Sequence, residues 1–224
     1  MKKTLTVSAL LLVTFISTAQ IFRERDRNSF IGARVGYSLA GWKGLAYVYP
    51  DLTYTNVSGF HAGVFISLRV ADNITIEPGA YYSAKGWGVE GMVDDGVNDY
   101  EGTITNNYSC IDAPLMLRIY LKGLNFGVGP QFSLPLKSEV KFEGMVNGQP
   151  VPSQTIENTV DLNDLDIAAS LAIGYEFNWG LSFTATYDVG LTLAHADDPY
   201  PYEFPIWSES KSRVVKLSVS FILY

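Results

Sequence analysis

Histidine, cysteine and closely spaced acidic residues are the side chains of this sequence that could do chemistry, and they are few. His195 stands next to Asp197 and Asp198, and an Asp-His pair could activate a water molecule. His61 has no serine or aspartate at a diagnostic spacing, and no nucleophile elbow, HExxH motif or Gly-rich phosphate loop occurs. One cysteine excludes a disulfide framework and a multi-cysteine zinc site. We therefore expect a protein that is not an enzyme and carries no cofactor.

Five basic and five acidic side chains recur on one parity of alternating segments along the chain. Equal numbers of opposite charges suit pairing away from water, because a buried charge needs a partner. The set could form a polar relay or gate in a narrow pore, or a salt-bridged plug. The plug is favoured, because Phe65, Tyr81 and Met116 share the same parity. The predicted cluster consists of Arg34, Arg69, Glu77, Lys85, Asp112, Arg118, Asp166, Glu176, Asp188 and Lys216.

Two of the connecting segments could contact a partner. Residues 140–146 and 156–162 alternate on either side of Asn147-Gly148, which predicts a protruding hairpin. Its edge could pair with a partner strand, or it could be only a stiff loop. Residues 199–207 are aromatic and Pro-rich, and either bind a partner or lie in an interfacial aromatic belt. The candidate contact residues are Phe142, Val146, Ile156, Tyr200, Tyr202, Phe204 and Trp207.

An acidic run, Asp94, Asp95, Asp99 and Glu101, offers oxygen ligands of the kind that calcium prefers. The run lacks the EF-hand pattern, so a solvated acidic loop is the favoured interpretation. No metal site is predicted.

The elements that must position these residues are strands, because apolar side chains recur at every second position. No helix-period segment of comparable length competes, and no internal apolar run reaches the 18 residues of a membrane helix. Pro78 and Pro130 fall in mid-strand, where they predict local bulges. The eight alternating segments are 31–39, 60–70, 74–82, 111–121, 124–134, 167–177, 181–193 and 215–223.

The apolar parity is predicted to face outward. The interior of an eight-stranded barrel is just wide enough to be filled by side chains, and the large apolar residues would overfill it. The other parity is rich in Gly and Ser, which suits a narrow interior. A closed barrel also pairs every backbone group, as lipid requires. A soluble lipocalin-like barrel with the apolar parity inside is the less favoured alternative.

Short and long connections alternate, so three short turns lie at one end of the predicted barrel and four long loops at the other. Residues 1–19 are predicted to be a secretory signal. Lys2 and Lys3 precede a twelve-residue apolar run, and small residues follow the run, directly before the expected cleavage point. Residues 20–28 form a polar lead-in, and residues 29–224 form the barrel domain. With 16 basic and 23 acidic residues, the chain lacks the excess of positive charge that nucleic-acid binding requires, so nucleic acid is not an expected partner.

Six short stretches span nearly the whole chain after the signal: GARVGY at 32–37, IEPGAYYS at 76–83, APLMLR at 113–118, GVGP at 127–130, IGYE at 173–176 and KLSVSF at 216–221. In the order and spacing of these six stretches, the chain resembles the small outer-membrane barrels of the OmpX/OmpA kind. It resembles more closely the PorT-type outer membrane protein beta-barrel domain family of Gram-negative bacteria. The resemblance implies fold and location but little about activity. The family's namesake works in protein secretion across the outer membrane, a role that fold alone does not transfer.

Together these patterns predict an all-β protein, an eight-stranded antiparallel up-and-down transmembrane barrel of the bacterial outer membrane. It is expected to be a monomer with outer-membrane lipid around it and a filled polar lumen. Its expected role is structural, or one of surface interaction with a protein partner at the long loops. The alternative is an accessory role in secretion.

Overall fold

A computed structural model describes residues 29–43, 53–94, 99–157, 165–192 and 211–223. The predicted signal sequence (1–19) and lead-in (20–28) lie outside these ranges. Within them, no helix has the length and apolar character that a membrane crossing would require.

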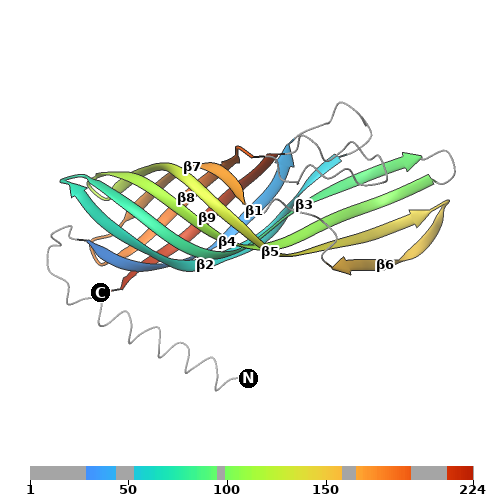
Figure 1. Cartoon of the computed structure of the whole chain (residues 1–224), viewed down its shortest axis with the longest axis horizontal. Coiled ribbons are helices and arrows are strands. Elements are labelled where there is room, and N and C mark those ends of the chain that lie inside the picture. The colour runs from blue at the N-terminus through green and yellow to red at the C-terminus, as the bar shows by residue number, and fades with distance from the viewer. Residues whose placement is uncertain (1–28, 44–52, 95–98, 158–164, 193–210, 224) are drawn as a thin grey trace, which may run out of the picture.

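The described residues form nine strands in one antiparallel sheet (Figure 1). The alternation of apolar and polar side chains, dense in Val, Ile, Tyr and Phe, explains why these segments are extended. In chain order the strands are β1 (Phe30–Lys43), β2 (Thr53–Ala71), β3 (Ile74–Asp94), β4 (Asp99–Leu121), β5 (Leu124–Val146), β6 (Gln149–Glu157), β7 (Asp166–Glu176), β8 (Leu181–Gly190) and β9 (Lys211–Leu223).

The sheet closes on itself into a ring. Every strand except β6 has a hydrogen-bonded neighbour on both sides, because β1 pairs with β9 and β4 pairs with β5. β6 pairs with β5 alone. The sequence predicts eight strands, and β6 is the additional one. It lies in the third long connection. The predicted turn at Asn147-Gly148 is confirmed, and the second arm of the hairpin is β6 at 149–157, whereas the sequence placed it at 156–162.

Tight turns join β2 to β3, β4 to β5 and β7 to β8, where the sequence predicts short connections. Lys122 and Gly123, between β4 and β5, have φ values of 51° and 94°. Asn147 and Gly148, between β5 and β6, have φ values of 52° and 72°. Positive φ at both central residues is what a two-residue type I′ hairpin turn requires, and Asn-Gly tolerates it best.

The ring is apolar outside and polar inside. Outward-facing side chains such as Val35, Val64, Leu117 and Leu217 are 43–60% exposed. The alternate positions are buried and include serines, charged residues and glutamine. A soluble lipocalin-like barrel would have the opposite arrangement, so the predicted orientation of the two faces is confirmed.

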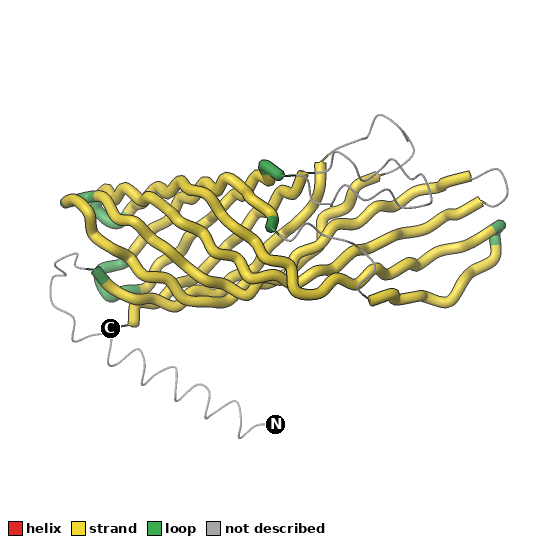
Figure 2. The backbone as a smooth tube through the Cα atoms, viewed as in Figure 1, coloured by secondary structure: helices red, strands yellow, loops and turns green. Residues whose placement is uncertain are grey.

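Strands β3, β4 and β5 continue well past the closed ring. They contain 21, 23 and 23 residues, whereas β7 and β8 contain 11 and 10. β7 pairs with β5 only from Leu124 to Ser133, so beyond Ser133 no described strand joins β5 to the rest of the ring on that side. We call residues 86–94, 99–109 and 137–157 the extension; it projects beyond the slanting strands of the ring (Figure 2).

The sidedness of the sheet reverses in the extension. Its lumen-side positions carry Trp87 and Val89, which are buried, and its outward positions carry charged side chains such as Lys137 and Glu143. In β5 the change follows a bulge, since Cys110 pairs with Pro135 while Ser109 pairs with Lys137. Leu136, the extra residue, is 59% exposed, and the even-numbered positions of β5 face inward from Ser138 onward.

Two expectations about local structure are wrong. Pro78 and Pro130 do not mark bulges, since the strand register is the same on both sides of each proline. Both face outward, and backbone pairs are missing next to them, which accommodates a residue without an N–H group. The second long connection, expected as an acidic loop, is largely strand: β3 and β4 pair as far as Asp94 and Asp99.

Candidate functional site

The first group of buried charges lies around Glu77 on β3, and we call Arg34, Glu77 and Arg118 the Glu77 cluster. Arg34 Nη2 lies 2.9 Å from Glu77 Oε1, and Arg118 Nε lies 3.1 Å from Glu77 Oε2. One carboxylate therefore joins guanidinium groups from β1 and β4. Arg34 also donates to Ser220 and to the Tyr81 hydroxyl, and Arg118 donates to Asn125 at 2.7 Å. These contacts pair most of the buried donors, but Arg118 Nε makes only the ion-pair contact with Glu77 and no hydrogen bond.

Glycines on neighbouring strands make room for aromatic side chains beside this cluster. The Phe65 ring lies where a Cβ of Gly32 would be, and the Tyr81 ring covers Gly79 in the same way. The Arg34 guanidinium lies 4.4 Å from the centroid of the Phe65 ring, a cation–π distance. The glycines on the lumen parity thus leave room for a few large side chains, and these fill the interior.

The second group lies around Asp112 on β4, and we call Lys85, Asp112, Asp188 and Lys216 the Asp112 cluster. Lys85 Nζ lies 2.6 Å from Asp112 Oδ1, and Lys216 Nζ lies 3.1 Å from Asp112 Oδ2. Lys216 also lies 2.8 Å from Asp188 Oδ2. Hydroxyl groups of Ser83 and Ser133 donate to Asp112, and Ser170 donates to Asp188.

Each of these contacts joins different strands of the ring, so the cluster ties β3, β4, β8 and β9 together across the lumen. No sequence-local pattern specifies such pairs, because the partners are as much as 104 positions apart. Closure of the ring is what brings them together.

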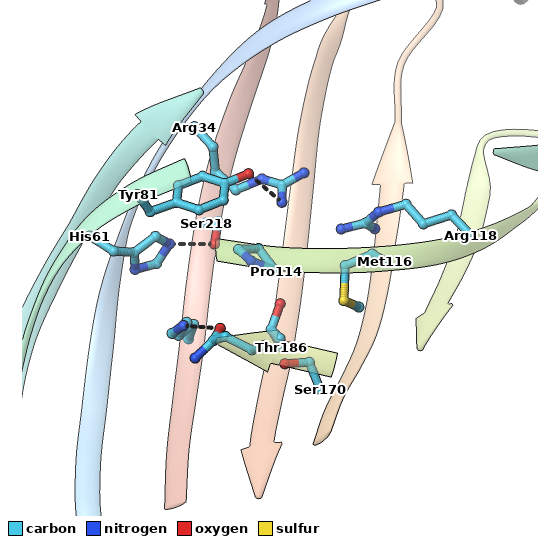
Figure 3. Close-up of a pocket in the computed structure, with 11 residues that line it drawn as sticks. Arg34, His61, Tyr81, Pro114, Met116, Arg118, Ser170, Thr186 and Ser218 are labelled. Carbon is cyan, nitrogen blue, oxygen red and sulfur yellow. Dashed lines mark hydrogen bonds between the residues drawn. The ribbon is translucent and has the colours of Figure 1, made fainter. Parts of the chain in front are cut away.

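A cavity of about 30 Å³ lies between the two clusters (Figure 3). Arg34 and Arg118 border it from the Glu77 cluster and Lys216 borders it from the Asp112 cluster. His61 and Ser218 lie on its wall, with His61 Nε2 and Ser218 Oγ 2.9 Å apart. A space of this size holds a single small ion or water molecule and is too small for an organic substrate.

Seven of the ten predicted lumen charges are buried in these two clusters. Asp166 and Glu176 are half-buried, and Asp166 accepts hydrogen bonds from Thr192 and Ser212. Arg69 does not join the clusters. It is exposed beside the β2–β3 turn, where a register shift interrupts the alternation, and pairs with Asp72 at 2.9 Å.

The His61–Ser218 contact was missed by the sequence reasoning, which found no serine at a diagnostic spacing from His61. The one sequence signal for this contact was the shared parity. His61 and Ser218 are both at lumen-facing positions, on β2 and β9, the two strands that flank β1. His195, Asp197 and Asp198 lie outside the described residues.

The predicted partner-contact residues divide between the extension and undescribed segments. Phe142 and Val146 are half-buried on the lumen-side face of β5, and Ile156 lies on β6, where its backbone pairs with Val140. Tyr200, Tyr202, Phe204 and Trp207 lie outside the described residues.

The acidic run predicted as a weak calcium candidate lies at the tip of the β3–β4 hairpin. Asp94 and Asp99 are backbone partners there, Asp99 and Glu101 are exposed, and Asp95 is outside the described residues. Among the described residues, no three His, Cys, Asp or Glu side chains group so that they could hold a metal ion.

The lumen-side face of the extension has its own small apolar core. Trp87 and Val89 are buried there, with Tyr54, Ile104 and Tyr108 packed against them. Burial raises the pKa of the Tyr54 hydroxyl above its ordinary value. The extension is therefore a packed sheet, with an apolar face and a polar face.

A closed sheet with an apolar outside and a charged inside is the architecture of an outer-membrane barrel. The family model described as "Outer membrane protein beta-barrel domain" matches residues 18–195. The chain belongs to this family. The match ends before β9, the strand whose pairing with β1 closes the ring. Membership supports a location in the bacterial outer membrane.

Several solved structures of outer-membrane proteins are similar to this chain at low identity. Ail, the attachment invasion locus protein of Yersinia pestis, is 13% identical with a TM-score of 0.48, covering 88% of this chain and 99% of Ail. Neisserial surface protein A is 10% identical with a TM-score of 0.39, covering 87% and 97%. The N-terminal barrel domain of Pseudomonas aeruginosa OprF is 12% identical with a TM-score of 0.34, covering 85% and 97%. No curated protein sequence matches the chain.

Proposed function

We propose that this family member is an eight-stranded transmembrane barrel with a closed lumen, which presents the extension outside the cell as a binding surface for a protein partner. All strands except β6 form the barrel, and β6 belongs to the binding surface. The barrel is a monomer surrounded by outer-membrane lipid and has no catalytic role. Residues 1–19 direct its export, and the three tight turns face the periplasm.

Strand length is the observation that carries this proposal. A transmembrane β-strand needs about 9–11 residues. β7 and β8 have 11 and 10, whereas β4 and β5 have 23 each, so about half of each long strand is available beyond the membrane. The reversal of sidedness at Leu136 supports the same boundary, because charged outward positions such as Lys137 and Glu143 suit water and not lipid.

The form of the extension suits recognition of a protein. Its outward face carries alternating charges, in which Lys137 pairs with Glu139 and Lys141 pairs with Glu143. Met92 and Met145 are exposed near its tip, on strands that flank Glu101. Apolar side chains set among charges on a rigid sheet offer both contact area and specificity.

The edge of the sheet restricts how a partner can bind. β6 is an edge strand among the described elements, and Pro150 and Pro152 remove N–H groups from it. Pairing of a partner strand along the whole of β6 is therefore disfavoured. We propose contact through the faces and tip of the sheet.

Cross-linking in intact cells tests this proposal. Cys110 is the single cysteine of the chain and is fully buried, so a Met145→Cys variant has one accessible thiol for a photoreactive maleimide. A discrete protein adduct is expected from Met145→Cys. The matched control is Val128→Cys, whose side chain faces lipid and should give no protein adduct.

Two results would overturn the proposal. The first is that the maleimide does not label Met145→Cys in intact cells. The second is that the labelled variant, in the bacterium that naturally makes the protein, gives no cross-link to another protein. An adduct with a component of the secretion machinery would assign the accessory role that the PorT-type resemblance suggests. A clean deletion would then alter the secreted proteins.

A further inference from the structure

The charged side chains that line the cavity between the two clusters are all basic. They are Arg34 and Arg118, which Figure 3 shows, and Lys216, and no Asp or Glu side chain is among the lining residues. The three basic groups come from β1, β4 and β9, so their convergence follows from closure of the ring. All three are at most 9% exposed.

The buried charges of the described residues do not balance. Four basic side chains, Arg34, Lys85, Arg118 and Lys216, face three carboxylates, Glu77, Asp112 and Asp188. In the Asp112 cluster two lysines meet two aspartates. In the Glu77 cluster two arginines share one glutamate, so the excess positive charge lies beside the cavity. Asp166 and Glu176 are half-buried and do not line it.

A buried polar atom without a partner lies at the same place. His61 is 3% exposed, and its Nδ1 has no hydrogen-bond partner among the described residues. Its Nε2 contacts Ser218 Oγ, which also borders the cavity. Arg118, which also lines the cavity, has a second such atom, its Nε, so two lining residues have a buried nitrogen available to an occupant.

We propose that the cavity binds one small monovalent inorganic anion of the chloride class. A single anion would neutralise the excess charge of the two arginines, and the volume of about 30 Å³ admits one such ion. A water molecule could fill the same space but would leave the charge uncompensated, which is costly in a low-dielectric interior. The ion is structural, and this proposal does not depend on what the extension binds.

Halide dependence of unfolding is the first test, on the full-length chain without its signal, refolded in a non-ionic detergent. Chloride should raise the unfolding midpoint in a saturable way when it replaces gluconate at constant ionic strength, as expected for a ligand that binds only the folded state. An Arg118→Gln variant removes the excess charge and should lose this dependence. Lys137→Gln, in an exposed ion pair of the extension, is the control that keeps it.

Bromide diffraction is the second test and needs only the natural sequence. Crystals grown in bromide should give one anomalous peak in the cavity, within hydrogen-bond distance of Arg118 or Arg34. Density for water alone with no halide dependence of the midpoint overturns the proposal. Equal halide dependence in Arg118→Gln and the natural sequence also overturns it, because the ion would then bind elsewhere. If Arg118→Gln does not fold, the bromide peak still decides.

Discussion

The Glu77 cluster depends on Glu77 itself. It contacts two arginines from different strands, and it is 3% exposed. Breaking a buried ion pair is expensive, because the remaining charge stays in the interior without a partner. Because two guanidinium groups share this one carboxylate, replacing Glu77 leaves both without their charged partner. The loss of folding free energy is therefore larger than for a pair of one acid and one base.

We expect Glu77→Gln to lower the free energy of unfolding by about 3–5 kcal/mol, measured by urea titration of the protein folded in detergent or lipid. Arg69→Gln is the matched control. It breaks the exposed contact with Asp72, and a surface pair contributes only about 0–1 kcal/mol. Equal effects of the two substitutions would show that the lumen pairs do not hold the barrel together.

At this scale the sequence predicted which residues face the lumen but not which residues touch. Parity alone placed Arg34, Glu77 and Asp112 inside. It failed for Arg69, where the register shifts near the end of β2. The contacts of Lys216 with Asp112 and of His61 with Ser218 depend on the closed ring, and alternation along one strand contains no information about them.

Strand β5 shows how one bulge can separate two environments. Before Leu136 its even-numbered residues face outward, and after it they face inward. The hairpin at Asn147-Gly148 was predictable because its turn residues carry a local signal. The strand character of 86–109 was not predicted from alternation, because its apolar residues change parity, although Asp95-Gly96 is a turn dipeptide between the two segments.

A charge scan along β5 should locate the membrane boundary. Val128→Arg places a cation in the middle of the apolar band, where the expected loss is about 2–4 kcal/mol of folding free energy. Met145→Arg makes the same change on the outward side of the extension and should leave stability almost unaffected. Folding into lipid vesicles, read as a shift in gel mobility between unheated and heated samples, measures both. Comparable losses would place the extension in lipid.

The closed part of the molecule is a ring whose interior is occupied by its own side chains, with one small cavity between the two clusters. The largest fully buried side chains of the ring include Arg118, Asp112 and Asp188. The fold class and the direction of the two faces were predictable from composition and alternation. The hairpin that contains β6 was predictable from Asn147-Gly148, but the start of β6 at Gln149 was not, because the sequence alternation placed the second arm at 156–162.

A filled interior should not conduct ions. In planar-bilayer recordings we expect the protein to show no stable large conductance at any applied voltage within the range that the bilayer tolerates. A porin inserted in the same bilayer serves as the positive control. Stable, uniform current steps from the purified chain would show that the two clusters form a gate and not a plug.

The buried charges also matter before the barrel exists. Strands β1, β3, β4, β8 and β9 each place a charged side chain among their apolar ones: Arg34, Glu77, Arg118, Asp188 and Lys216. A translocon retains segments that are continuously apolar over roughly 20 residues, and a charge in the middle of a segment strongly opposes its retention. In a chain exported through an inner membrane, the residues that pair in the finished lumen would also oppose retention of these segments. Replacing them with leucine would endanger delivery as well as stability.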